Sequence, residues 1–253
     1  MASRTFGAGA LLALLLAAPA AAQAPAEGFA TMGRDAAGYA EVRRDTAITF
    51  PADHYAHPDF RIEWWYVTAT LTGEDGEPYG VQWTLFRYRT DPEADGEGWA
   101  TPTLWMGHAA ATSAETHKAA ERLARGGIGQ AGVAEPFEAW IDNWALVSEA
   151  PADADPYDRL RMTAAGDGFA YDLTLTAEGP LVLHGEGGYS VKSDRGHASH
   201  YYSQPAFRAE GRLTLQGREI AVTGRAWLDL EWSSQPLDAD QTGWDWFSIS
   251  LDD

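Results

Sequence analysis

The sequence predicts a mostly β protein, either a sandwich or a barrel. Short stretches of strand character recur along the chain, and turns rich in Gly, Asp and Pro separate them. Eleven tryptophans among 253 residues supply large apolar side chains, either for a β core or for an apolar ligand cavity. A single segment has the pattern of a helix, so strands are expected to make up most of the fold.

The first 22 residues have the pattern of a secretory signal peptide. Arg4 precedes an apolar run from Ala8 to Ala18, and small residues follow it up to Ala22. This run is too short to span a membrane. We therefore expect a periplasmic or secreted protein with no transmembrane segment in the mature chain. Residues 23–44, rich in Ala and Gly, are expected to form a loosely held leader.

Charge and composition argue against several classes of function. A formal net charge of −19 leaves no basic stripe to displace counterions, so we expect no nucleic-acid partner. Without cysteine the chain has neither a disulfide framework nor a thiol nucleophile. The sequence also contains no Gly-x-Ser-x-Gly nucleophile elbow, phosphate loop or dinucleotide fingerprint.

Histidines offer only weak signals for a metal or a nucleophile. The pairs His54/His57 and His197/His200 have a spacing that metals sometimes use. Both pairs lie in loop-like contexts, where hydrogen bonding to the backbone is the commoner role. Serines near His200 could form a Ser–His pair, but adjacency in sequence does not give the geometry of a triad. We expect no metal and no cofactor.

The elements follow one another after the leader. One helix is expected over residues 113–125, where Thr112 and Glu115 are spaced as a capping box and two glycines at 126–127 form the stop. The turns GEDG and QGRE are typical of hairpins. Strands are expected over residues 62–71, 80–88, 139–147, 159–164, 170–176, 208–215, 220–232 and 244–251.

The segment FRIEWWYVTATL places a glutamate directly before three aromatic residues. In a strand, Glu63 would point to the same side as Trp65 and Leu71, which belong to an apolar row. A carboxylate buried there must either pair with a cation or hold its proton more tightly than in water. Arg87 has the parity of the apolar residues on the next strand. A Glu63–Arg87 ion pair and a partly protonated Glu63 beside a ligand therefore both stay open.

Two further stretches set carboxylates among tryptophans. In the first, Asp229 and Glu231 share one strand face with Trp227 and Arg225, as on an ordinary half-exposed strand, unless that face looks into a cavity. In the second, residues 244–253, an aspartate again stands between two tryptophans. The chain stops there, where a hairpin turn would be expected. We therefore expect a second β unit that is truncated after its first strand.

These residues together resemble the AttH-like family. The likeness rests on FPADHYAHPDFRIEWWYVTATL, GHAA, DNW, SHYYSQP and GRAWLDLEWSSQPL followed by GWDWFSISLDD, and it runs from about Phe50 to the last residue. Members of this family are exported lipocalin-like proteins, often described as secreted hydrolases and related to carotenoid 1,2-hydratase. The resemblance implies two consecutive calycin-type β-barrels. The first would be a lipocalin-like barrel over 45–235, and the second a barrel that begins within 236–253 and is truncated.

The resemblance implies an apolar ligand, a lipid or an isoprenoid, and leaves three functions open. The first is a binder or carrier of such molecules, accessory to an ABC export system. The second is a cofactor-free hydratase that adds water to an isoprenoid or carotenoid double bond. In it, a carboxylic acid would protonate the alkene and aromatic faces would stabilise the carbocation. A secreted hydrolase has the least support, since neither a nucleophile nor a metal motif accompanies the family's label.

For the hydratase, the resemblance implies Asp229 as the acid, with Glu231 or Glu63 orienting water. Leu228 and Leu230 flank Asp229 where the family more often has Met or His, so no histidine acid stands there. The expected ligand-binding residues are Trp64, Trp65, Tyr66, Arg87, His108, Tyr201, Tyr202, Trp232, Trp244, Asp245 and Trp246.

Overall fold

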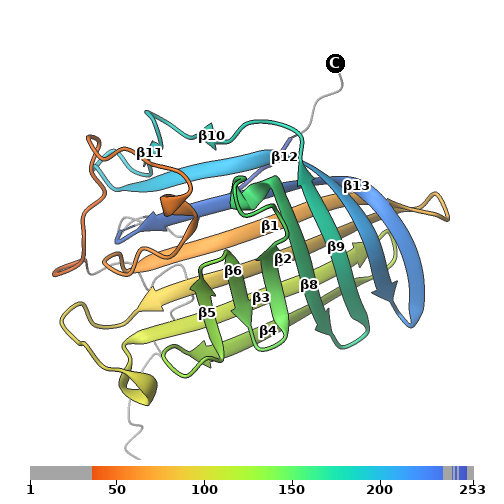
Figure 1. The fold of residues 1–253 in the computed structure, drawn as a ribbon, viewed down its shortest axis with the longest axis horizontal. Helices are drawn as coiled ribbons and strands as arrows, with labels where there is room; N and C mark the ends of the chain where they lie inside the picture. Colours follow the sequence, from red (N-terminus) through yellow and green to blue (C-terminus); the bar gives the residue numbers. More distant parts are fainter. Residues whose placement is uncertain (1–35, 236–240, 242, 244, 250–253) are drawn as a thin grey trace, which may run out of the picture.

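A computed structural model describes residues 36–235, 241, 243 and 245–249. The predicted signal peptide, the first part of the predicted leader and Trp244 lie outside the described residues. Within them, antiparallel strands form one 13-stranded sheet that curls into a nearly closed barrel (Figure 1). The mostly β, lipocalin-like fold is confirmed. No helix among the described residues has the length and apolar character needed to cross a membrane.

The first and the last long strands meet in the middle of the sheet. Figure 1 shows β1 in orange beside β13 in blue. Across the sheet the order is β4-β3-β2-β1-β13-β12-β9-β8-β7-β6-β5, and β10 and β11 pair with β12. In chain order the elements are η2 (Ala52–His54), β1 (Ile62–Gly73), β2 (Pro78–Arg89), η3 (Gly98–Ala100), β3 (Thr103–Ser113), β4 (His117–Arg125), β5 (Ala131–Ala134), β6 (Glu138–Ile141), β7 (Trp144–Ser148), η4 (Pro156–Asp158), β8 (Arg159–Gly166), β9 (Phe169–Ala177), β10 (Val182–Leu183), β11 (Tyr189–Val191), β12 (Ala198–Leu215) and β13 (Arg218–Ser233).

The prediction of a helix over residues 113–125 is wrong. This segment forms a hairpin turn and the edge strand β4, which pairs with β3 along its whole length. Ser113 Oγ accepts hydrogen bonds from the N–H groups of Glu115 and Thr116, so Glu115 of the predicted capping box lies in a hairpin turn instead. Pairing with β3 satisfies the main chain of β4 and overrides the helix propensity of its residues. The helices among the described residues are 3-10 helices of 3 residues each.

Two predicted strands also differ from the structure. Residues 139–147 do not form one strand, because Asp142 takes a φ of 53° and turns the chain between β6 and β7. In the predicted strand 244–251, the described residues 245–249 have no regular secondary structure. No strand of the described residues pairs with them, and a strand needs such a partner for its main-chain hydrogen bonds. A second barrel that begins within 236–253 therefore stays a prediction.

Large side chains fill the interior of the barrel. On β1, Trp65 and Val67 point inward and are fully buried. Strands β3 and β6 pack closely across the interior. A Cβ atom added to Gly107 of β3 would lie only 2.6 Å from Cγ2 of Ile141 on β6. The tryptophans and tyrosines of this interior are therefore core residues. The largest fully buried aromatic side chains are Trp65, Trp83, Trp144, Tyr157, Tyr202, Phe137 and Phe207.

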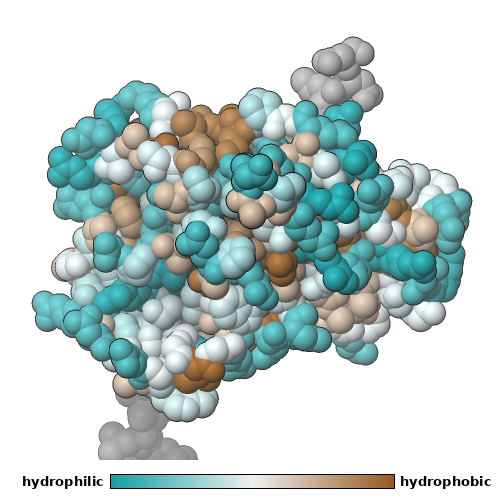
Figure 2. Space-filling view, viewed as in Figure 1, coloured by the Kyte–Doolittle hydropathy of each residue, from teal (hydrophilic) through white to brown (hydrophobic). Residues whose placement is uncertain are grey.

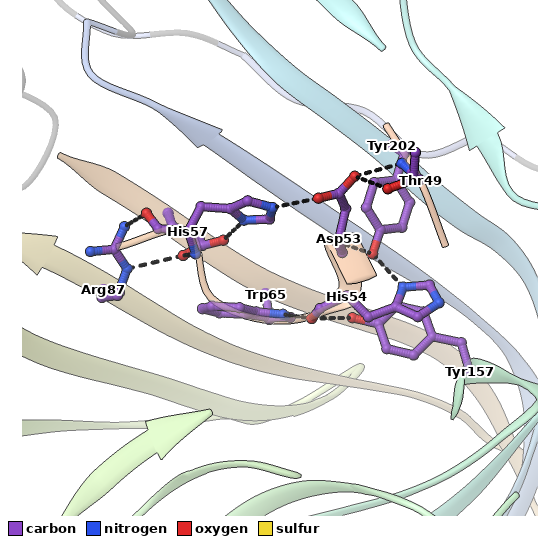
Figure 3. Close-up of polar contacts among 9 residues, drawn as sticks. Thr49, Asp53, His54, His57, Trp65, Arg87, Tyr157 and Tyr202 are labelled. Carbon is purple, nitrogen blue, oxygen red and sulfur yellow. Dashed lines mark hydrogen bonds and ion pairs between the residues drawn. The ribbon is translucent and has the colours of Figure 1, made fainter. Parts of the chain in front are cut away.

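Glu63 lies inside one end of the barrel in a buried ion pair with Arg87. The Nε atom of Arg87 is 3.0 Å from Glu63 Oε2. His57 Nδ1 is 2.5 Å from the other carboxylate oxygen, and its Nε2 is 3.1 Å from Asp53 (Figure 3). Burial would raise the pKa of Glu63, but the hydrogen bonds from His57 and the charges of His57 and Arg87 lower it. Of the two expectations for Glu63, the structure shows the ion pair.

A second histidine ties the segment before β1 to the core. His54 Nδ1 lies 2.7 Å from the Tyr202 hydroxyl (Figure 3). Its Nε2 lies 3.0 Å from Asp155. The main-chain carbonyl of His54 accepts a hydrogen bond from Trp65 Nε1 at 3.1 Å. His54 is fully buried. The polar groups of this segment thus find their partners inside the barrel, where an unpaired polar group would be costly.

Trp65→Ala tests the role of the packed interior. The change removes a fully buried indole and its hydrogen bond to the main chain, so we expect the free energy of unfolding to fall by about 3–5 kcal/mol in a urea titration followed by circular dichroism. Trp99 is 73% exposed and provides the matched control. Trp99→Ala should change the same free energy by less than about 0.5 kcal/mol. Equal losses in the two variants would contradict a tightly packed core around Trp65.

The pH dependence of stability tests the His57 network. Burial would lower the pKa of His57, but the hydrogen bonds and charges of Asp53 and Glu63 raise it from 6.5 to about 9. The group binds its proton more tightly in the folded state, so its contribution is fully present below pH 6.5 and is lost as the pH rises through about 9. We expect the free energy of unfolding to decrease across this window.

The matching measurement is urea unfolding of wild type, His57→Gln and His117→Gln at several pH values in that window. His57→Gln should flatten the decrease, whereas His117→Gln, at an exposed site, should keep the wild-type slope. A wild-type slope in His57→Gln would show that other groups produce the pH dependence.

Candidate functional site

The outer face of the central strands carries the candidate site. Because side chains alternate along a strand, Trp64 and Tyr66 point away from the core that contains Trp65. The pairing of β1 with its neighbours then sets two cross-strand rows side by side on this face. One row is Ser203, Asp229, Tyr66 and Thr84, and the other is Tyr201, Glu231, Trp64 and Phe86.

A cavity of about 230 Å³, here called the outer-face cavity, lies over these rows. Trp246, from the segment after β13, contributes one side of it. Its ring centroid is 4.9 Å from that of Tyr66, and its Nε1 donates a hydrogen bond to the Tyr201 hydroxyl at 3.4 Å. The cavity thus combines aromatic walls with two carboxyl groups. Its lining residues are Trp64, Tyr66, Gln82, Thr84, Phe86, Tyr201, Asp229, Glu231 and Trp246.

Asp229 accepts hydrogen bonds from two neighbouring side chains. Its Oδ1 accepts hydrogen bonds from the Ser203 hydroxyl and, at 2.7 Å, from Trp227 Nε1. Burial raises the pKa of Asp229 and outweighs the lowering by its hydrogen bonds with Ser203, Trp227 and Tyr201. The group therefore keeps its proton to a higher pH than an ordinary aspartate, as a general acid must.

Glu231 lies two residues further along the same face and is held by a lysine. Lys192 Nζ is 2.6 Å from Glu231 Oε1 and 4.8 Å from the centre of the Tyr201 ring. Burial raises the pKa of Glu231 and outweighs the lowering by Lys192, and the neighbouring Asp229 raises it further. Alternate residues of a strand are about 7 Å apart. One small ligand group can therefore contact both carboxyl groups.

Ser203 connects Asp229 to a histidine. His184 Nε2 lies 2.6 Å from Ser203 Oγ, and the His184 ring stacks on Tyr201 with 4.0 Å between centroids. In a catalytic triad the carboxylate orients the histidine, and the histidine activates the serine. Here the carboxylate of Asp229 contacts the serine itself. This order does not activate Ser203 as a nucleophile, so it disfavours a hydrolase of the serine class.

The structure divides the predicted site residues between the two faces of the sheet. At the outer-face cavity lie Trp64, Tyr66, Tyr201, Asp229, Glu231 and Trp246. On the inner side lie Glu63, Trp65, Arg87, Tyr202 and Trp232, all of them buried. Trp65, Tyr202 and Trp232 are therefore core residues and not part of the pocket wall. Of the two residues expected to orient water, Glu231 shares a face with Asp229, and Glu63 does not.

The other predicted residues lie around the cavity or away from it. His108 is on the outer face of β3, where its ring is 5.4 Å from Phe86 and its Nε2 is 3.0 Å from Glu121. It therefore supports the cavity wall from outside. Asp245 is exposed to solvent. No cluster of His, Asp or Glu side chains in the described part of the chain is arranged to hold a metal ion.

Several residues around the cavity were not predicted from sequence. Gln82, Thr84 and Phe86 alternate with the apolar residues of the predicted second strand, so pairing it with the first would have placed them on the outer face. No such pattern marks His184 and Lys192. They follow the very short strands β10 and β11, and only the folded chain brings them to Ser203 and Glu231.

Comparison with known proteins agrees with this architecture. The solved structure of an AttH protein from Nitrosomonas europaea is similar, with a TM-score of 0.66 and 36% identity, and the match covers 79% of this chain and 60% of that one. Kievitone hydratase from Nectria haematococca is similar in fold, with a TM-score of 0.52 and 18% identity, over 74% of this chain and 52% of that one. No curated protein matches the chain.

The family comparison covers most of the chain. A family model described as AttH-like matches residues 41–253. The same residues include both cross-strand rows and the outer-face cavity. The chain spans 60% of the length of the Nitrosomonas protein, so the likeness covers part of that protein. Because the family model matches most of the sequence, this chain belongs to the AttH-like family.

Proposed function

We propose that the outer-face cavity binds an unsaturated apolar molecule, a lipid or an isoprenoid, and that Asp229 catalyses the addition of water to its double bond. The observation that carries this proposal is a buried carboxyl group with a raised pKa in a cavity walled by aromatic side chains. The cavity volume of about 230 Å³ is below that of typical small-molecule pockets, roughly 300–1,000 Å³. One end of a longer ligand therefore fits it best.

The proposed reaction uses both carboxyl groups and the aromatic walls. Asp229 gives its proton to one alkene carbon, which leaves a tertiary carbocation on the other. The faces of Trp64 and Tyr66 stabilise this cation by cation–π attraction. Glu231, as the carboxylate beside Lys192, orients a water molecule and takes its proton as the new C–O bond forms. One water is added, and no redox partner is needed.

The likeness to a hydratase of the same fold motivates this proposal but names no substrate for this chain. Kievitone hydratase shares the fold at 18% identity, which supports the architecture alone. A pattern typical of a signal peptide in the first 22 residues supports export to the periplasm or beyond. An ABC transporter as partner stays a prediction from the family resemblance.

A carrier without catalysis is the second candidate, and one observation favours it. Both carboxyl groups already have protein partners, Ser203 and Trp227 for Asp229 and Lys192 for Glu231. Such partners are also what a purely structural pair of buried carboxylates would require. In that case the cavity would hold the apolar ligand unchanged.

Asp229→Asn separates the two candidates. The full chain is incubated with squalene, an acyclic polyene, in oxygen-18 water, and the apolar extract is measured by mass spectrometry. Wild type should give a product heavier by one labelled water. Asp229→Asn removes the proton donor and should lower the rate at least about 100-fold, with squalene binding, followed by tryptophan fluorescence, largely intact.

Asp172 gives the matched control, because it is paired with Arg161 away from the cavity. The Asp172→Asn variant should hydrate squalene at the wild-type rate. Retained turnover in Asp229→Asn would rule out Asp229 as the acid. Unchanged squalene that stays bound to wild type would identify a carrier and reduce the carboxyl groups to structural partners.

A further inference from the structure

A chain of three side chains leads from the outer-face cavity to the half-buried ring of His184. The Asp229 carboxylate accepts a hydrogen bond from Ser203 Oγ, and Ser203 Oγ lies 2.6 Å from His184 Nε2. Ser203 is fully buried and Asp229 is 2% exposed. The connection between carboxyl group and imidazole is therefore shielded from water along its length.

The two hydrogen bonds that link His184, Ser203 and Asp229 have a defined direction. A serine hydroxyl has a single hydrogen to donate. When Asp229 is ionised, after it has given up its proton, Ser203 donates this hydrogen to it. The Ser203 oxygen then accepts the hydrogen bond from His184, whose Nε2 carries the proton. Both bonds thus point toward Asp229. Trp227 Nε1, 2.7 Å from the same carboxylate oxygen, holds that oxygen in place.

A hydration cycle requires such a path. Once Asp229 has given its proton to the ligand it must regain one, and an apolar ligand in the cavity blocks water from that side. After the reaction Glu231 carries the proton of the attacking water, but it lies about 7 Å further along the strand, with the ligand over both groups. The hydrogen bonds of Asp229 lead to Ser203 and Trp227 instead. The remaining polar neighbour that leads away from the cavity is Ser203, which contacts His184.

We propose that His184 and Ser203 form a proton relay that recharges Asp229. As the Nε2–H bond of the His184 imidazolium breaks, a new O–H bond forms on Ser203, and the original serine proton passes to Asp229. The imidazole is left neutral and regains a proton from solvent. For each turnover one proton enters through His184 and one leaves through Glu231, so the charge of the site is restored.

The surroundings of His184 suit this role. Burial lowers the pKa of His184, while the charge of Asp229 raises it and that of Lys192 lowers it. The ring of Tyr201 covers one face of the imidazole. A histidine that releases its proton readily is the better donor to a carboxylate.

A purely structural role is the competing explanation, and the fold shows what it would be. Strand β10 pairs with β12, with Val182 opposite Ser203, and a bond between His184 and Ser203 could simply fix β10 on the sheet. Figure 2 shows a hydrophobic patch over β10, where Val182 and Leu183 are exposed. A latch of this kind would hold the strand but would not couple the protonation of His184 to that of Asp229.

The first experiment needs no substrate. Histidine ring nitrogens of the full chain are followed by nitrogen-15 NMR across a pH titration, and the His184 signal is assigned by its loss in His184→Gln. Wild type should show the Nε2–H tautomer and a second titration step that reports Asp229. Asp229→Asn and Ser203→Ala should remove this second step, and Ser203→Thr, which keeps the hydroxyl, should retain it. A titration unchanged in Ser203→Ala would overturn the relay.

The second experiment tests the relay in turnover and rests on the proposed function. With squalene, Ser203→Ala and His184→Gln should lower kcat about tenfold or more with KM nearly unchanged, and imidazole in the buffer should restore turnover of His184→Ala. Wild-type kcat in the folded Ser203→Ala variant would overturn the relay while hydration stands. NMR coupling without any hydration by wild type would keep the relay and reject the proposed reaction.

Discussion

The pairing of β1 with β13 is the constraint on which the rest of the structure depends. It sets Glu63 opposite Trp232 on one face of the sheet and Tyr66 opposite Asp229 on the other. A shift of the register by one residue would exchange the two faces and bury the wrong carboxyl groups. The register therefore decides which acid pairs with a guanidinium and which one has its pKa raised by burial among aromatic rings.

The alternation of side chains along a strand made part of this division between the two faces predictable from the sequence. The alternation in IEWWYVTATL correctly put Glu63 with the apolar row and with Arg87. Parity could not say which face of β13 looks into a cavity, because tryptophans occur on both of its faces. That choice depends on the strands beside it and on Trp246, which folds back over the sheet from outside the barrel. Trp65, Tyr202 and Trp232, which the family resemblance implied as ligand-binding residues, lie in the buried core.

The errors elsewhere have physical causes as well. Lys118 to Arg125 is rich in residues that favour helices, yet an edge position beside β3 offered the main chain better hydrogen-bond partners. His184 carries no periodic signal, and its contact with Ser203 joins residues that are 19 positions apart. Contacts of this kind arise from the tertiary fold, so neither propensity nor motif can reveal them.

The two-sided sheet also separates the side chains that keep the protein folded from those that line the outer-face cavity. Inner side chains such as Trp65 are fully buried, so a change of their volume disturbs the close-packed interior. Outer positions such as Gln82 and Phe86 lie at the cavity, where a change of side chain need not disturb the packed interior. Side chains of the outer rows can thus change while the packed barrel stays the same. The outer face of the sheet can therefore vary in shape and chemistry with little loss of stability.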